Sequence, residues 1–400
     1  MSIRTPVYLD HNATTPMDPR VLDLQQEVAR THFGNPASAH HAFGWAAARL
    51  VEEARAEVAG LVGVTPREII FTSGATEAAA LAVLGAAELW RPEDAGGVGS
   101  SGEPGHLVIS AFEHDAVEAP VQRLEARGWR VTRVAPGAGG VVEPGAVADA
   151  IEPATLLVAV MAAQNEIGTL QPIGDIGAIC RERRVLFLCD AAQAAGKVPL
   201  DATTQDIHLL ALSAHKLHGP KGVGALYVRR RDPRVVLAPL VSGGGQERGL
   251  RGGTLNVPGI VAFGEACRLA GLEMDGDAVH LRGLAERFLA VLRRELTDWV
   301  LNGDPVRRLP GQLNLSFAGV RAHRLLGALP VLAVSSSSAC SSAESRPSRV
   351  LAALGVPDAL ASASLRLAPG RFTTAKEMDF AAHAVVAAVR RLRTEEPDRR

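Results

Sequence analysis

The sequence predicts an α/β protein: a large domain with a mostly parallel central sheet flanked by helices, followed by a smaller α/β domain. Short apolar runs such as 156–161 and 185–188 alternate with helical patterns, as in parallel sheets joined by crossover helices. Polar residues follow these runs, where ligands bind in such sheets. After the glycines 243–245 the helical patterns become longer, which places a domain boundary near Gly259.

The individual elements follow from local patterns. A short apolar start at 7–9 precedes polar turns at 10–16 and 33–38, and an alanine-rich helix with its apolar residues on one face then continues to Leu61. Further helices are expected at 75–90, from His114 to about 128, and at 258–272, 278–296 and 376–392. Strands are expected at 68–71, 106–110, 156–161, 185–188, 207–212, 223–228, 313–317, 331–334 and 364–367, and an exposed loop at 91–105.

Composition excludes several classes of function. The formal net charge of −1, with 21% charged residues, leaves no basic surface for nucleic acid or for an acidic membrane. No apolar run reaches the ~18 residues that span a bilayer, and residues 1–6 lack the apolar core of a signal peptide. We expect a cytoplasmic protein. The four cysteines have no metal-binding spacing, so neither a disulfide framework nor a metal site is expected.

Lys216 lies in a polar turn between two apolar runs, 207–212 and 223–228. A buried lysine amine loses solvation, and the same penalty makes it nucleophilic enough to form a Schiff base. The chain has only four lysines, Lys197, Lys216, Lys221 and Lys376, and uses arginine for its other positive charges. Arginine cannot form an imine. A solvated turn lysine remains the alternative for this residue taken alone.

Pyridoxal 5'-phosphate fits the other groups. Its ring nitrogen needs an acid, and Asp190 ends an apolar run. Gln193 could donate to the phenolic oxygen, and His114 could cover the ring. The helix start at Ala75 and Thr76 offers backbone N–H groups to a phosphate, together with Ser213 and His215. Helix capping also explains Asp190 and residues 73–77 taken singly. A nicotinamide cofactor fits less well, because no G-x-G-x-x-G opens a first βαβ unit.

The chain resembles a cysteine desulfurase of the class V aminotransferase group over nearly its whole length. The resemblance rests on ordered motifs at residues 8–10, 13–16, 33–38, 71–77, 113–114, 165–168, 190 with 193, 215–222, 247–254, 338–340 and 370–374. The Ser-Ser-x-Ser-Ala-Cys loop is similar to the long-loop branch of the family. The resemblance implies a pyridoxal-phosphate-dependent transferase of fold type I. Its large domain would hold residues 15–260, and its small domain residues 1–14 and 261–400.

The resemblance also implies roles for individual residues. Lys216 would carry the cofactor and lift the Cα proton of L-cysteine. His114 would stack on the ring and shuttle protons. Arg366 with Asn165 would bind the substrate carboxylate. Thr254 would reach the phosphate from the other subunit of a homodimer. Cys340 would take the substrate sulfur as a persulfide, release alanine, and pass sulfur to an acceptor protein such as an iron–sulfur scaffold.

Cys340 fits this role by its context, a loop of small polar residues, whereas Cys180, Cys189 and Cys267 lie in apolar contexts. Its thiolate could also serve as a transient ligand of an iron–sulfur cluster in a partner. The chain departs from the family pattern at residues 78–80, 162–164, 192 and 337. These departures leave open the catalytic rate and the acceptor. Two alternatives stay open: an aminotransferase or lyase acting on another small amino acid, and a non-catalytic assembly scaffold.

Overall fold

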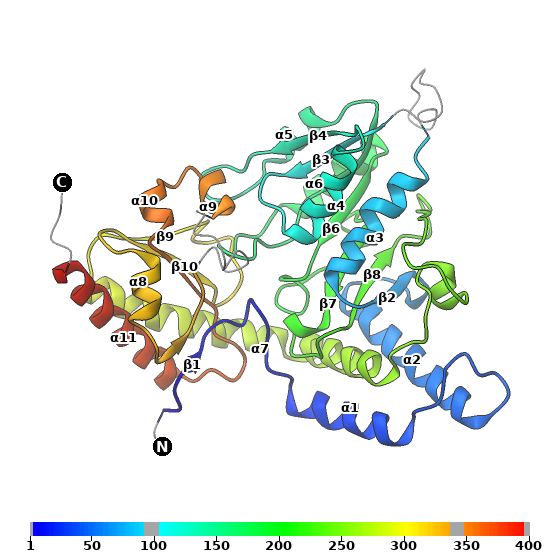
Figure 1. Cartoon of the computed structure of the whole chain (residues 1–400), viewed down its shortest axis with the longest axis horizontal. Helices are drawn as coiled ribbons and strands as arrows, with labels where there is room; N and C mark the ends of the chain where they lie inside the picture. Colours follow the sequence, from blue (N-terminus) through cyan, green and yellow to red (C-terminus); the bar gives the residue numbers. More distant parts are fainter. Residues whose placement is uncertain (1–2, 92–103, 337–347, 396–400) are drawn as a thin grey trace.

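A computed structural model describes residues 3–91, 104–336 and 348–395 of the chain (Figure 1). Its largest sheet has the strand order β2-β8-β7-β6-β5-β3-β4. Only β8 runs antiparallel to its neighbours, so the prediction of a mostly parallel central sheet is confirmed. The strands are β2 (Ile69–Thr72), β3 (His106–Ser110), β4 (Arg130–Val134), β5 (Thr155–Ala159), β6 (Leu186–Asp190), β7 (Leu209–Ser213) and β8 (Gly224–Val228).

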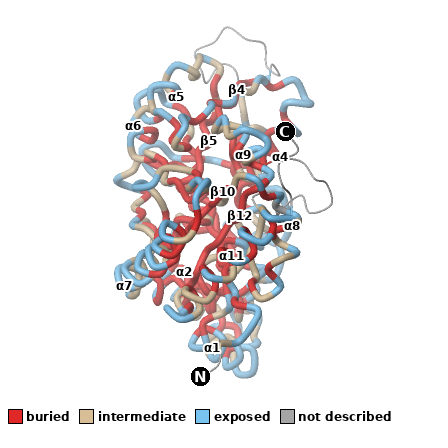
Figure 2. Tube along the Cα trace, turned by 90° about the vertical axis from the view of Figure 1, so that its left-hand side faces the viewer, coloured by how far each residue is buried: buried red, intermediate tan, exposed pale blue. Residues whose placement is uncertain are grey.

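Helices cover both faces of this sheet because alternate residues of each strand point to opposite sides. Ile69 and Phe71 of β2 pack in one apolar core, and Ile70 between them packs in the other. The first core takes α1 (Pro19–Thr31), α2 (Ala42–Leu61), α5 (Pro144–Ala150) and α6 (Ile173–Arg183). The second takes α3 (Ala75–Glu88) and α4 (Asp115–Glu125). Figure 2 shows the buried residues concentrated in the interior.

A third core joins the start of the chain to its last part. Val7 and Leu9 pack there with residues of a three-stranded antiparallel sheet in the order β12-β10-β9. The strands are β9 (Trp299–Leu301), β10 (Leu313–Phe317) and β12 (Ser364–Leu367), and β1 (Val7–Tyr8) pairs in parallel with β11 (Leu332–Ala333). The helices α8 (Ala322–Gly327) and α11 (Ala375–Glu395) pack in this core, whereas α9 (Arg349–Ala353) and α10 (Asp358–Ala361) place their buried apolar residues in the first core. The domain limits themselves stay a prediction.

One helix, α7 (Val257–Glu295), runs along both parts of the molecule (Figure 1). The expectation of two helices, 258–272 and 278–296, was therefore wrong. The residues between them are polar and include Gly276, which favours a break. The helix continues because its two ends are buried in different cores. In its middle, Glu273 binds Arg20 at 2.6 Å and Asp277 binds Arg371 at 2.8 Å.

The sequence patterns missed the strands β4 and β9 and the helices α1, α5, α6, α8, α9 and α10. β4 lies at the edge of its sheet and has only one buried residue, so it lacks the apolar run that marks the inner strands. Three short 3₁₀ segments were also not predicted: η1 (Pro66–Glu68), η3 (Ala214–Lys216) and η4 (Gln246–Gly249). Of the expected exposed loop at 91–105, residues 92–103 lie outside the described part. No helix among the described residues has the length and apolarity to cross a membrane.

Candidate active site

Five of the expected site residues stand at or just beyond the carboxyl ends of parallel strands. Asp190 is the last residue of β6 and Ser213 the last of β7, while Lys216 ends the 3₁₀ turn η3 that follows β7. His114 follows β3 and caps α4, because its Nδ1 accepts a hydrogen bond from the Ala116 amide at 3.0 Å. Asn165 follows β5. Parallel strands of one sheet bring these residues to a common edge.

The Lys216 amine binds two backbone carbonyls of the N-terminal segment. Its Nζ donates to the oxygen of Asn12 at 2.6 Å and to that of Ala13 at 2.8 Å. The same segment is held over the lysine turn, since the amide and the hydroxyl of Thr15 both donate to the His215 carbonyl at 2.9 Å. The lysine thus has a fixed, partly dehydrated place.

Asp190 places a buried carboxyl near this amine. It is 7% exposed, and its Oδ1 accepts the amide N–H of Ala192 at 2.9 Å. Burial raises its pKa, while that hydrogen bond and the charges of His114 and Lys216 oppose the rise. A cation bound against Asp190, such as a protonated ring nitrogen, would favour the ionised carboxylate. Gln193 is buried beside it and donates through Nε2 to the Asn12 carbonyl at 2.8 Å.

The start of α3 offers a site for an anion. Gly74 is its N-cap and supplies no side-chain acceptor, so the amides of Ala75 and Thr76 have no hydrogen-bond acceptor in the described part of the chain. Ser213 lies beside this junction, because a Cβ built on Gly74 would be 3.8 Å from its Oγ. A Cβ on Gly224 would lie 2.6 Å from the Gly74 Cα, so this close approach of two backbones requires glycine.

Arg366, on β12, brings a guanidinium to the site from the smaller part of the molecule. It is 4% exposed, and its Nη2 binds Asp10 Oδ1 at 2.8 Å. Nη1 donates to the Asn165 carbonyl at 3.3 Å, and the buried Nε has no acceptor among the residues described. Arg366 can therefore still donate to a ligand carboxylate.

The remaining expected residues are less constrained. His215 lies two residues after Ser213, and burial, then the charges of nearby lysines, lowers its pKa to about 4. Thr254 is exposed, and its contribution to a neighbouring subunit stays a prediction. Cys340 lies outside the described residues. Cys180, Cys189 and Cys267 are buried, and burial raises the pKa of each thiol, which makes them unreactive.

Hydrogen bonds attach both flanks of the segment that contains Cys340 to the site. Before it, Ser335 Oγ donates to Asp10 Oδ2 at 2.8 Å, so that Asp10 binds Arg366 and Ser335 together. After it, Ser348 Oγ donates to Glu166 Oε2 at 2.6 Å, next to Asn165. These serines were not among the predicted residues. Asn12 and Ala13 were missed as well, because they act through backbone carbonyls and side-chain identity gives no signal for that.

The site fits pyridoxal phosphate by its donor set. It has an amine held by two carbonyls, a buried acid close to that amine, and amides at a helix start for a phosphate. No cluster of three or more His, Cys, Asp or Glu side chains suited to a metal ion occurs within residues 3–91, 104–336 and 348–395.

Comparison with known proteins agrees with this geometry. The sequence model of the class V aminotransferase family matches residues 7–380. A cysteine desulfurase of Mus musculus is 47% identical over 99% of this chain and 84% of its own length. The cysteine desulfurase IscS of Anaeromyxobacter dehalogenans is 47% identical over 99% of this chain and 95% of its own. The chain belongs to the cysteine desulfurases, pyridoxal-phosphate-dependent enzymes of the class V aminotransferase family.

Solved structures of this family have the same fold. A NifS-like protein superposes with a TM-score of 0.87 at 34% identity, covering 96% of this chain and 99% of that protein. A structure described as SspA in complex with cysteine gives a TM-score of 0.78 at 33% identity, covering 92% of this chain and all of the other. The expected transferase fold is thereby confirmed, and so is the family to which the sequence motifs pointed.

Glu113, next to His114, gives a prediction about pH and stability. Burial raises the pKa of its carboxyl to about 8, against 4.5 for an ordinary glutamate, although Ser110 and the Met161 amide donate to it. The native state therefore keeps a proton between these pH values that the unfolded chain loses. This contribution to stability is full below pH 4.5 and is lost as the pH rises through about 8.

We expect Glu113→Gln, which keeps the shape but cannot ionise, to lose less thermal stability than the parent protein between about pH 5 and about pH 8. Unfolding midpoints measured by circular dichroism across this range test the prediction. Glu57→Gln, at an exposed glutamate, serves as the control and should follow the parent. Parallel curves for Glu113→Gln and the parent protein would show that Glu113 is ionised in the native state.

Proposed function

We propose that this enzyme converts L-cysteine to L-alanine and collects the sulfur on its own Cys340 as a persulfide. The observation that supports this most is the attachment of Ser335 and Ser348, on either side of the Cys340 segment, to Asp10 and Glu166 at the site. Lysine chemistry alone would serve many amino-acid reactions. Cys340 lies between these two serines in the sequence, and a cysteine there favours sulfur transfer.

In this proposal the bound pyridoxal phosphate supplies an electron-withdrawing ring that weakens bonds at the substrate Cα. Lys216 holds the cofactor and accepts the Cα proton, and Asp190 keeps the ring nitrogen protonated. Gln193 donates to the phenolic oxygen, and His114 covers the ring and moves protons. The phosphate is bound by the amides of Ala75 and Thr76, by Ser213 and His215, and by Thr254 of a second subunit.

Substrate binding and sulfur transfer complete the scheme. Arg366 and Asn165 bind the substrate carboxylate, since a guanidinium matches a carboxylate with two parallel hydrogen bonds. The Cys340 thiolate then attacks the substrate sulfur. An S–S bond forms, the C–S bond breaks, and its electron pair remains on the substrate carbon, which gains a proton. One L-cysteine and one enzyme thiol thus give one L-alanine and one enzyme persulfide.

Several parts of the proposal concern partners. We infer a homodimer, because Thr254 is exposed in a single chain and in this proposal binds the phosphate in the site of the other subunit. Sedimentation of the holoenzyme measures the mass. Delivery of sulfur to an iron–sulfur scaffold or a thio-cofactor pathway stays a prediction. So do the cytoplasmic location and any transient iron–sulfur ligation by Cys340.

The central test uses L-cysteine with a reducing thiol and measures alanine and sulfide. We expect Cys340→Ala to lose sulfide release by at least about 100-fold, the scale of removing a reacting group, while it still binds the cofactor. Lys216→Ala should lose both the reaction and the borohydride-reducible link to the cofactor. Cys267→Ala, at a buried cysteine, is the matched control.

Undiminished sulfide from Cys340→Ala would contradict the persulfide step and favour a lyase. Turnover that requires a keto acid would favour an aminotransferase. A parent protein without a reducible imine at Lys216 would favour an assembly scaffold.

A second prediction concerns the substrate carboxylate. Arg366→Lys keeps the positive charge beside Asp10 but loses the planar fork, so we expect KM for L-cysteine to rise about 10- to 100-fold, as for a lost charged hydrogen bond. Steady-state kinetics measure this, with the exposed Arg287→Lys as the control. A changed kcat with an unchanged KM would assign Arg366 to another task.

A further inference from the structure

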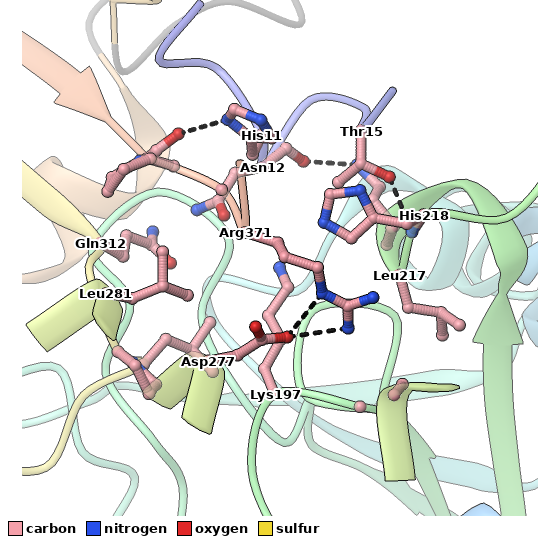
Figure 3. A pocket seen from close by; sticks show the side chains of 18 of the residues that line it. His11, Asn12, Thr15, Lys197, Leu217, His218, Asp277, Leu281, Gln312 and Arg371 are labelled. Atoms are coloured by element: carbon pink, nitrogen blue, oxygen red, sulfur yellow. Dashed lines mark hydrogen bonds and ion pairs between the residues drawn. The ribbon is translucent and has the colours of Figure 1, made fainter. Parts of the chain in front are cut away.

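A pocket lies beside Lys216, between the N-terminal segment, the turn after β6, α7 and the loop after β12 (Figure 3). Asn12, Lys197, Lys216, Asp277 and Arg371 are among its lining residues. Lys197 belongs to none of the motifs that indicated the function. A second lysine in the same pocket as the first is costly, because each ammonium disfavours the other.

Lys197 is joined to Lys216 by a short chain of hydrogen bonds. Lys197 Nζ donates to Gln193 Oε1 at 3.1 Å, and Gln193 Nε2 donates to the Asn12 carbonyl at 2.8 Å. That same carbonyl accepts Lys216 Nζ at 2.6 Å. The two amines are therefore linked indirectly, through the side-chain amide of Gln193 and the backbone oxygen of Asn12.

This chain permits only one orientation of the Gln193 amide. A carbonyl oxygen can only accept, so the NH₂ group must face Asn12, and the amide oxygen must then face Lys197, which donates. In the flipped orientation the amide oxygen would face the Asn12 oxygen and its NH₂ group would face the lysine amine. The contact between the two oxygens would be repulsive, and the ammonium form of Lys197 could not accept from the NH₂ group. Gln193 is buried, so water cannot replace the lost hydrogen bonds.

The orientation has a consequence for Lys216. A donor bound to the amide oxygen polarises the amide and strengthens its N–H as a donor. That N–H competes with Lys216 for the Asn12 oxygen. The second N–H of Gln193 Nε2 has no acceptor within the described residues and is available to a ligand at the site.

We propose that Lys197 is a positioning residue: it anchors the Gln193 amide with its N–H toward the Asn12 carbonyl and the cofactor site, and so sets how firmly Lys216 holds its proton. The inference rests on the proposed role of Lys216 as the residue that binds the cofactor. It adds a residue to that site and does not depend on the fate of the sulfur.

A direct effect of charge can be separated from positioning. Burial, then the charges of Lys216 and Arg366, lowers the pKa of Lys197 to about 7. Above that pH its amine is neutral and exerts little charge, but it still donates to Gln193. Other ionisable groups around the two lysines come from every element packed against them: Asp10, His11, His114, Asp190, His215, His218, Lys221, Asp277, Arg366 and Arg371.

The test replaces Lys197 by methionine, which has similar length but no donor. The full-length protein is labelled with ¹³C at lysine Cε, and the four lysines give a spectrum simple enough to assign by variants. The titration midpoint of Lys216 is measured in the apoprotein, and that of the visible absorbance in the holoenzyme. Lys221→Met removes an exposed lysine from the same turn as a control.

We expect Lys197→Met to raise both midpoints by about 0.5–1 pH unit, the size of one lost hydrogen bond, and Lys221→Met to leave them nearly unchanged. In a Gln193→Leu background the effect of Lys197→Met should fall below half. An equal shift in both backgrounds, or no shift with Lys197→Met, would overturn the proposal. If the parent protein forms no reducible imine between Lys216 and the cofactor, the proposed function is refuted, but the titration midpoint of Lys216 in the apoprotein still tests the role of Lys197.

If Lys197→Met does not fold, Gln193→Glu provides the second variant. A carboxylate at this position bound to Lys197 should raise the Lys197 midpoint by more than about one pH unit, as an opposite charge in contact does. An unchanged Lys197 midpoint would show that residues 193 and 197 are not in contact and would also overturn the proposal.

Discussion

A lysine amine withdrawn from water must find acceptors, and here they are the backbone carbonyls of Asn12 and Ala13. This contact constrains the whole chain. The carbonyls belong to the segment after β1, which packs in the core of the smaller part, whereas Lys216 follows a strand of the central sheet. The amine is thus positioned only when both parts are folded and fixed relative to each other. The long helix α7, buried in a core at each end, fixes their relative position.

The same division explains why Arg366 comes from β12 and Asp190 from β6. In the proposed function Arg366 binds the substrate carboxylate and Asp190 pairs with the cofactor ring, and each residue is held by its own sheet. Asp10 links Arg366 to the Cys340 segment, because it binds Arg366 and also Ser335, which precedes that segment. The buried ion pair Arg55–Glu247 likewise joins distant segments, since it links α2 to the 3₁₀ turn η4. Glu247 also accepts the amide of Phe71 and fixes the residues that lead to Thr254.

Sequence patterns predicted what depends on side-chain type along a strand. Asp190, Ser213 and Lys216 follow apolar runs, so their place at the sheet edge could be read from period and composition. The acceptors of Lys216 could not, because every residue has a carbonyl. Nor could Lys197, whose neighbours are small residues typical of a turn. The break expected in α7 shows the limit of local propensity: Gly276 and its acidic neighbours favour an end, yet distant partners, Arg20 and Arg371, keep the helix intact.

Charge completes the case for an anionic ligand. Lys197, Lys216 and Arg366 converge on one site. The carboxyls near them include Asp10, already bound to Arg366 and Ser335, Asp277, already bound to Arg371, and Asp190, whose pKa is raised by burial. Burial first, and then the charges of Lys216 and Arg366, lowers the pKa of Lys197. A phosphate and a substrate carboxylate would offset these positive charges, and a neutral ligand would not. Two of the four lysines, Lys197 and Lys216, therefore lie where an amine can change its protonation state, while arginine supplies most of the fixed positive charges.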